Sequence, residues 1–273
     1  MSEIPLGKQT DYPEHYSAEV LFPVSRSDNR HGLGIGEVLP FGGFDHWRAY
    51  ELSWLNARGI PVVKMADILV PCTSLCLIES KSLKLYFNSL NQHQFASDEQ
   101  AVDVIQRDLS QVAGANVIVS LLDCSSVDAA QVSSPEYTVL LDSLEIDKLV
   151  YEPASSLLEI DSNSRCEEIF LSNLFRSRCP ITAQPDWGTI LIRYSGPSID
   201  HRSLLRYIIS YRQHSGFHEN CVEQIFVDLN AVCAPARLEI SINFLRRGGL
   251  EINPLRTLSV DEGMRPLPRL CRQ

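Results

Sequence analysis

A cysteine and an aspartate lie seven residues apart in residues 178–187 (RCPITAQPDW), a segment that contains two prolines. Each proline fixes its own φ angle and favours an extended conformation for the residue before it, which stiffens the backbone. Cysteine attacks as a thiolate, and a basic neighbour such as Arg178 can lower a thiol pKa from about 8.5. Asp186 could then deliver or accept the proton that the attack of Cys179 requires. The alternative is a buried free cysteine beside a turn.

The composition is that of a globular protein. The chain has 273 residues, 44% hydrophobic and 21% charged, which suits one large domain or two ordinary ones. No apolar run approaches the roughly 18 residues of a membrane helix, and residues 1–11 lack the apolar core of a signal peptide. The net charge of −10 argues against a nucleic-acid-binding surface. We therefore expect a cytoplasmic protein that binds neither membranes nor, directly, nucleic acid.

The eight cysteines are expected to be reduced, because the chain has no predicted export signal. Cys72 and Cys76 are four residues apart, as are His214 and His218, and such pairs could hold zinc. However, the sequence has no Cys-x-x-Cys pair, and Gly216 interrupts the histidine pair. We therefore expect no metal.

Two segments 121 residues apart resemble each other. Residues 79–86 (ESKSLKLY) align with residues 200–207 (DHRSLLRY), and the match continues with Ser89 opposite Ser210. An acid, a base, a serine, a leucine and a tyrosine recur in the same order, which indicates a duplicated domain. The spacing is too long for a solenoid repeat.

Both copies show the same predicted order of a strand, two helices and a strand. Residues 238–244 alternate between apolar and polar types, which predicts a sheet with one wet face. Strands joined as hairpins with helices to one side indicate an α+β architecture, divided into residues 1–125 and 126–273. The predicted ranges are 74–79, 82–91, 98–112 and 116–122 in the first copy, and 188–194, 201–214, 218–232 and 237–244 in the second.

The chemistry is divided between the copies. Only the second has Cys179 and Asp186, together with the adjacent pair His218 and Glu219. The first has Asp98 at the position of His218 and instead carries the cluster 79–81 (ESK). Neither half looks complete, and the sequence predicts a site to which both contribute.

These motifs resemble those of the QueF family, the NADPH-dependent 7-cyano-7-deazaguanine reductases, in their long two-module form. The resemblance covers nearly the whole chain. It is carried by residues 79–86, 178–187, 217–221 and 246–254, and by 6–8, 39–43 and 50–56. It implies two tandem tunnelling-fold modules, each an antiparallel four-stranded sheet with two helices on one face, and a homodimer of two such chains. It also implies conversion of the nitrile of 7-cyano-7-deazaguanine to an aminomethyl group with two NADPH, within queuosine biosynthesis.

The resemblance assigns catalytic roles in the second module. Cys179 would add to the nitrile carbon and form a covalent thioimide. Asp186 would shuttle protons to the nitrogen, for which its pKa must be raised by desolvation. His218 would assist substrate binding and proton transfer, and Glu219 would accept hydrogen bonds from the deazaguanine ring.

The resemblance assigns binding roles in both modules. Charged side chains would make charge-assisted contacts with the phosphates of NADPH. The residues are Ile78, Glu79 and Ser80 for the substrate, and Ser80, Lys81, Arg247 and Gly248 for NADPH.

Each motif also has a purely structural alternative. His218 and Glu219 could only cap a helix, Lys81 could lie on a solvated helix face, and residues 246–249 could be a plain turn. Residues 32–36 (GLGIG) lack the spacing of a dinucleotide-binding loop, and we set them aside.

Two other functions compete with nitrile reduction. One is a zinc-dependent, cyclohydrolase-like purine enzyme of the same fold, which would need a metal cluster. The other is a non-catalytic purine-binding protein, which would have no need for both Cys179 and Asp186.

Overall fold

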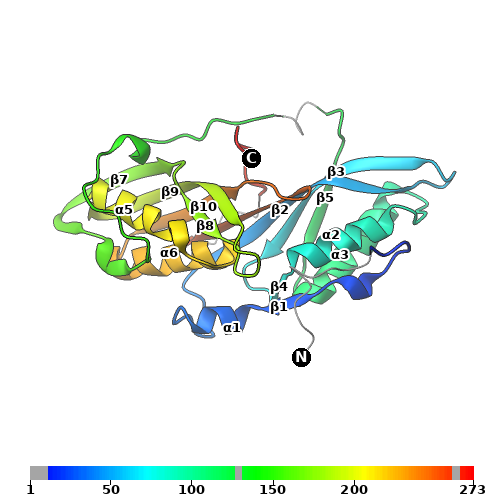
Figure 1. The fold of residues 1–273 in the computed structure, drawn as a ribbon, viewed down its shortest axis with the longest axis horizontal. Helices are drawn as coiled ribbons and strands as arrows, with labels where there is room; N and C mark the ends of the chain where they lie inside the picture. The colour runs from blue at the N-terminus through cyan, green and yellow to red at the C-terminus, as the bar shows by residue number, and fades with distance from the viewer. Residues whose placement is uncertain (1–11, 127–130, 260–264) are drawn as a thin grey trace. The chain divides into compact units, whose positions relative to one another are not determined.

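A computed structural model describes residues 12–126, 131–259 and 265–273 of the chain (Figure 1). The chain separates into two compact units. Unit 1 comprises Met1–Gly32, His46–Gln131 and Arg246–Glu251, and unit 2 comprises Leu33–Asp45, Val132–Leu245 and Ile252–Gln273. Each unit combines a β-sheet with α-helices that are not interleaved strand by strand, which confirms the predicted α+β class.

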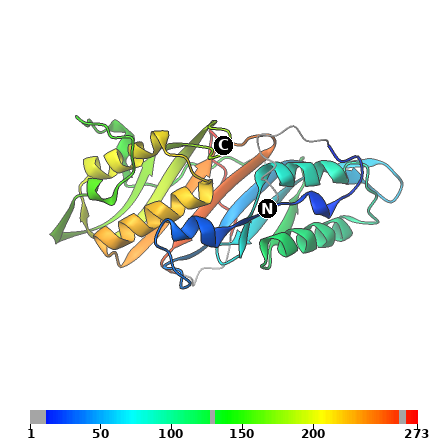
Figure 2. The same cartoon turned by 60° about the horizontal axis from the view of Figure 1, so that its bottom comes forward.

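Unit 1 has the strand order β5-β3-β2, and β3 pairs antiparallel with β5. The helices α2 and α3 lie side by side against these strands (Figures 1 and 2). A separate two-stranded ladder joins β1 to β4. The elements are η1 (Ala18–Val20), β1 (Pro23–Ser25), α1 (Arg26–His31), β2 (Gly42–Leu55, of which 42–45 belong to unit 2), β3 (Pro61–Pro71), β4 (Cys76–Ile78), α2 (Ser80–Leu90), α3 (Asp98–Ala113) and β5 (Ile118–Leu122).

Unit 2 has the strand order β11-β10-β9-β7-β6, with α5 and α6 side by side on one face of the sheet (Figure 2). The sheet is mixed rather than wholly antiparallel, because the two-residue edge strand β6 pairs parallel to β7. The elements are β6 (Val139–Leu140), η2 (Leu141–Ser143), η3 (Ser155–Leu157), β7 (Ile160–Ser172), β8 (Arg176–Arg178), β9 (Pro185–Ile199), α5 (His201–Ser210), η4 (Tyr211–Gln213), α6 (His218–Cys233), β10 (Arg237–Phe244) and β11 (Leu250–Thr257, of which 250 and 251 belong to unit 1).

Helix α6 packs on β10 through one apolar stripe. Val222, Phe226 and Leu229 recur at helical spacing and are fully buried. Each such side chain contributes about 1.5–3 kcal/mol when it leaves water. Helices α3 and α6 have 16 residues each. Within the described ranges, no helix combines the length and the apolar character needed to cross a membrane.

The prediction of one wet face on β10 is wrong in part. Leu238 and the other apolar residues of the strand are buried as expected, but Ser241 and Asn243 on the opposite face are buried too. The C-terminal segment covers that face: the Asn243 amide donates to the carbonyl oxygen of Pro268 at 2.9 Å, and Arg272 donates to the carbonyl oxygen of Gly188 at 2.9 Å. The apolar–polar alternation of a strand cannot predict that a segment distant in the sequence will cover its polar face.

The internal repeat reappears in the side-chain hydrogen bonds of the two units. In each unit a tyrosine of the first helix donates to an aspartate of the second, and a serine of the first helix donates to the carbonyl oxygen of that tyrosine. The bonds are Tyr86 to Asp108 (2.8 Å) and Ser89 to Tyr86 (2.6 Å) in unit 1, and Tyr207 to Asp228 (2.6 Å) and Ser210 to Tyr207 (2.6 Å) in unit 2.

Strands β2 and β3 were not predicted from the sequence. Their charged residues hide the apolar pattern, because several are paired in the interior. Arg48 donates to both carboxylate oxygens of Asp67, at 2.6 and 2.9 Å, and the His46 ring lies 2.7 Å from the same carboxylate. Buried charges need such partners, and the partners lie on different strands.

Candidate active site

The segment that contains Cys179 forms a hairpin between β8 and β9. Ser177 pairs with Asp186 and Arg178 with Pro185, which places the cysteine just beyond the end of β8. The loop is closed by two backbone bonds: Cys179 N–H donates to the Gln184 carbonyl oxygen at 2.9 Å, and Ala183 N–H donates to the Cys179 carbonyl oxygen at 3.0 Å. The stiff turn predicted from the two prolines is therefore present.

One face of this hairpin is buried. Successive side chains of a strand point to opposite faces, and Ser177 and Asp186 occupy paired positions. Asp186 is 3% exposed and Cys179 is 7% exposed. The thiol and the carboxyl are thus both removed from bulk water, on a hairpin that fixes the backbone of each.

His218 is the first residue of α6 and lies beside Asp186. Its Nε2 is 3.5 Å from Asp186 Oδ2, and its Nδ1 is 3.2 Å from the carbonyl oxygen of Ile252. A carbonyl oxygen only accepts, and therefore Nδ1 carries a proton and Nε2 is the atom that faces the carboxyl. The ring stacks on Phe244, with centroids 3.7 Å apart and planes at 6°. These contacts hold the imidazole in one orientation, suited to proton exchange with Asp186.

Cys221 and Glu219 lie on the first turns of the same helix. Both are buried. Burial raises the pKa of the Cys221 thiol to about 12; the Ser177 hydroxyl lowers it, and the charges of Asp186 and Glu219 raise it. Cys221 is therefore near both carboxylates but is held in the core as a neutral thiol.

Thiol labelling in the native protein should spare Cys221. With a pKa of about 12, about one molecule in ten thousand would carry the thiolate at pH 8. The exposed Cys124 and Cys271 should be alkylated by iodoacetamide first, and Cys221 only in denaturant, as followed by peptide mass mapping. Equal labelling rates at these three positions would contradict the buried position of Cys221.

Arg256 anchors the helix that carries His218 and Glu219. It is fully buried, with Nη2 2.7 Å from Glu223 Oε1 and Nη1 2.8 Å from Asp45 Oδ1. This cluster was not predicted from the sequence, because its three members are far apart along the chain. Removing one member would leave a buried charge without its partner, at a cost of about 3–5 kcal/mol.

The predicted substrate residues of unit 1 surround the start of α2. Ile78 ends β4, and Ser80 is the first residue of the helix. The Glu79 carboxylate caps this helix by accepting from the backbone N–H groups of Lys81 and Ser82, at 2.8 and 2.7 Å. Each carboxylate oxygen keeps a second lone pair. Glu79 therefore caps the helix, a role that was not predicted for it, and the cap leaves acceptor capacity for a ligand.

The predicted cofactor residues of unit 1 come together where α2 meets a tight turn. Gly248 and Gly249 both have positive φ, 57° and 78°, and Arg247 N–H donates to the Leu250 carbonyl oxygen at 2.9 Å, as in a two-residue hairpin turn. A Cβ at Gly248 would lie 3.1 Å from Lys84 Cε and 3.2 Å from its Nζ. Lys81 is one turn before Lys84 on the same helix. Two lysines and the Arg247 turn therefore share one region of unit 1.

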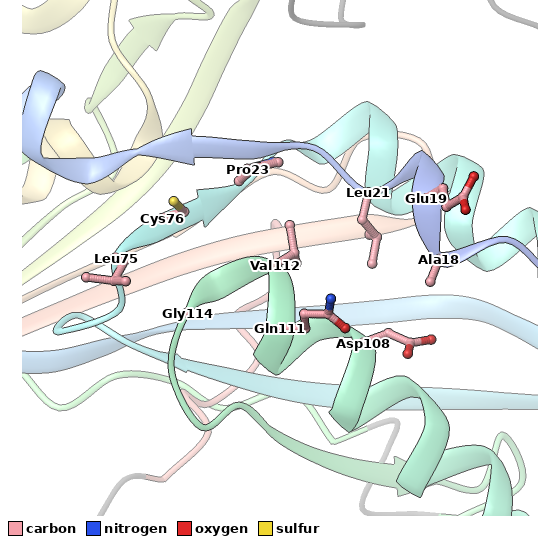
Figure 3. Close-up of a pocket in the computed structure, with 10 residues that line it drawn as sticks. All are labelled: Ala18, Glu19, Leu21, Pro23, Leu75, Cys76, Asp108, Gln111, Val112 and Gly114. Carbon is pink, nitrogen blue, oxygen red and sulfur yellow. The ribbon is translucent and has the colours of Figure 1, made fainter. Parts of the chain in front are cut away.

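A further pocket of unit 1 contains none of the predicted site residues (Figure 3). It has a volume of about 410 Å³. One of its two acidic residues, Asp108, accepts hydrogen bonds from Tyr16 and Tyr86, which gives that carboxylate a structural role. The lining residues are Ala18, Glu19, Leu21, Pro23, Leu75, Cys76, Asp108, Gln111, Val112 and Gly114.

The predicted residues thus form two groups, each within one unit. Asp186, His218 and Glu219 gather around the buried face of the β8–β9 hairpin that carries Cys179. The group of unit 1 surrounds the start of α2 and the turn at Gly248. Sequence reasoning missed Phe244 and the Ile252 carbonyl oxygen, which orient His218. A backbone acceptor has no side-chain signature, and only the strand register could have placed Phe244.

Comparison with known proteins agrees with these motifs. Residues 12–121 match the family model described as nitrile reductase, 7-cyano-7-deazaguanine-reductase N-term, and residues 185–261 match that of QueF-like protein. A protein of Desulfotalea psychrophila named NADPH-dependent 7-cyano-7-deazaguanine reductase is 48% identical, over 99% of this chain and 97% of its own length. A protein of the same name from Burkholderia cenocepacia is 49% identical, over 98% of both chains. This chain, matched over nearly its whole length, belongs to the family of the NADPH-dependent 7-cyano-7-deazaguanine reductases.

Proposed function

We propose that this protein reduces the nitrile of 7-cyano-7-deazaguanine to an aminomethyl group with two NADPH, in queuosine biosynthesis. The observation that carries the proposal is the contact between the buried Asp186 and the half-buried His218, 3.5 Å apart, beside the hairpin of Cys179 in a member of this family. A thiol, an acid and an imidazole are the groups that covalent capture of a nitrile needs.

The first step is addition of Cys179 to the nitrile carbon. A bond forms between Sγ and carbon, the C≡N triple bond becomes a double bond, and the thiol proton passes to the nitrogen, giving a thioimide. No atom leaves. The thioimide is a better hydride acceptor than a nitrile, and the covalent bond keeps it in place.

Asp186 carries the protons of this reaction. To donate to the substrate nitrogen near neutral pH, the carboxyl has to be protonated when the substrate binds, and burial is the condition that favours a neutral carboxyl. Nε2 of His218 lies beside it and can exchange a proton with it, while the Ile252 carbonyl oxygen keeps Nδ1 protonated.

Acidic side chains bind the deazaguanine in this proposal. Glu219 accepts hydrogen bonds from ring N–H groups, and its burial makes each such bond stronger than in water. Glu79, with Ile78 and Ser80, contributes further substrate contacts through the lone pairs that the helix cap leaves available.

The start of α2 and the turn at Gly248 fit a phosphate-bearing cofactor. A Cβ at Gly248 would lie tightly against the end of the Lys84 side chain. Glycine at this positive-φ position also lets the backbone approach a ligand closely. Ser80, Lys81, Arg247 and Gly248 would hold NADPH, with the two charged side chains on its phosphates. When bound, NADPH supplies the two hydrides of the reduction.

Gly248→Ala should raise the KM for NADPH about ten-fold, because alanine costs about 1–2 kcal/mol at positive φ and also meets Lys84. Gly59→Ala is the matched control: its φ is +73° and nothing lies within 4 Å of a Cβ there. We expect the control to lower the Tm similarly but to leave the KM unchanged. Equal KM values for both variants would contradict the role of Gly248.

We further propose that residues 1–125 and 126–273 form two tandem tunnelling modules and that two chains associate as a homodimer in the cytoplasm. The matching hydrogen bonds of Tyr86 and Tyr207 support the duplication. Light scattering coupled to size-exclusion chromatography should give about twice the mass of 30.7 kDa. A monomeric mass at micromolar concentration would contradict the dimer.

The decisive experiment omits the cofactor. We expect the protein mixed with 7-cyano-7-deazaguanine, without NADPH, to gain the full mass of the substrate, because the addition has no leaving group. Intact mass spectrometry under denaturing conditions measures the gain. Absence of an adduct, together with no NADPH consumption during turnover, would refute the proposed function.

A further inference from the structure

The second face of the β8–β9 hairpin is basic. Arg176 pairs with Trp187, and Arg178 lies two residues further along on the same face. Trp187 is 37% exposed, whereas Ser177 and Asp186 on the other face are buried. The hairpin that carries the reactive groups therefore turns its arginines and its tryptophan toward the opposite side.

Arg212 adds a third guanidinium from the short helix η4. The guanidinium carbons of Arg176 and Arg212 each lie 5.4 Å from the centroid of the Trp187 ring. Arg176 Nη1 also donates to the carbonyl oxygen of Arg212. One cation over an aromatic ring is a common arrangement, but two on the same ring hold like charges together, which costs free energy unless an anion is present.

Arg176 has hydrogen-bonding capacity left over. Its Nε is buried and has no hydrogen-bond partner among the described residues. Burial lowers the pKa of Arg176, the charges of Arg212 and Arg178 lower it further, and Asp186 opposes them. A buried donor without an acceptor is unfavourable, and a bound anion would supply the acceptor and the opposite charge together.

The size and charge of the cluster select the class of anion. Guanidinium groups bind phosphate and carboxylate through paired hydrogen bonds, and three positive charges match the two negative charges of a phosphate better than the single charge of a carboxylate. A protein that binds nucleic acid can contact about 6–10 phosphates. Three arginines on a chain of net charge −10 cannot provide that many contacts, which argues against a nucleic-acid ligand.

We propose that Arg176, Arg178 and Arg212 form a binding site for a phosphate group on the face of the hairpin opposite to Asp186. The phosphate belongs either to NADPH, in which case the inference rests on the proposed function, or to a free phosphate or nucleotide. In both cases the ligand would hold β8 and η4 together and stabilise the hairpin that carries Cys179.

The test measures binding of inorganic pyrophosphate and of NADPH by calorimetry in a buffer free of phosphate. The proteins are the wild type, R212Q, R176Q/R212Q and the control R237Q, which removes an exposed arginine outside the cluster. We expect R212Q to weaken binding about ten-fold and the double variant to weaken it further, since each lost charge-assisted bond has about that effect. R237Q should bind like the wild type.

The two probes distinguish the sources of the phosphate. Weaker binding of both pyrophosphate and NADPH assigns the site to the cofactor, and weaker binding of pyrophosphate alone assigns it to a free phosphate. If neither probe binds more weakly to R176Q/R212Q than to the wild type, the site does not exist. Formation of the Cys179 adduct without NADPH shows that each variant is folded. Failure of the wild type to form it, together with no NADPH consumption during turnover, would refute the proposed function. The pyrophosphate result alone would then decide whether the site exists.

Discussion

Cys179→Ala should lose the mass adduct with 7-cyano-7-deazaguanine and lower kcat by at least about 10⁴-fold, as expected when a covalent nucleophile is removed. Cys179 is 7% exposed at the end of β8, and its backbone N–H and carbonyl are both bonded within the loop. Alanine keeps these backbone bonds. The loss should therefore reflect the missing sulfur rather than a change in the hairpin.

Cys271→Ala is the control for this experiment, because Cys271 is an exposed thiol of the same unit. It should form the adduct and turn over as the wild type does. An adduct that persists in Cys179→Ala, located by peptide mapping on another cysteine, would overturn the assignment of the nucleophile.

Asp186→Asn should retain substrate binding and lower kcat by about 10²–10⁴-fold, the usual contribution of a general acid or base. Asparagine has nearly the same shape and fills the buried position beside His218, but it cannot carry a proton to the substrate nitrogen. Substrate Kd is measured by calorimetry, and NADPH consumption is followed by absorbance.

The matched control is Asp161→Asn, an exposed aspartate of the same unit. It should behave as the wild type. Turnover of Asp186→Asn within about three-fold of the wild type would refute the proton shuttle, because general acid–base catalysis contributes far more than that.

Local signals made the two long helices α3 and α6 predictable. The second helix of the first copy was predicted at 98–112 and is observed at Asp98–Ala113, where Ser97 accepts from Gln100 N–H at the start and Gly114, with φ 67°, ends it. Caps, a left-handed glycine and a periodic apolar stripe all act within a few residues. The duplication and the family motifs are likewise properties of the linear chain.

The polar interior was not predictable in the same way. Asp67 is bonded to His46 and Arg48 across strands, and Arg256 is paired with Glu223 and Asp45. Charged residues in a sequence normally indicate surface, and only their partners, brought close by the fold, make burial possible. The strands β2 and β3 were missed for this reason.

The sequence by itself determined that Cys179 and Asp186, the residues proposed to carry the chemistry, lie close together on a stiff turn, because residue type and near spacing are local facts. Only the tertiary structure decided which groups surround them. The 3.5 Å approach of His218 to Asp186, and the stacking that orients its ring, join residues from different elements. The tertiary structure also decided which face of the hairpin is buried and which is basic. Strand pairing sets which side chains share a face, and the sequence of a single strand does not indicate which face will pack against the core.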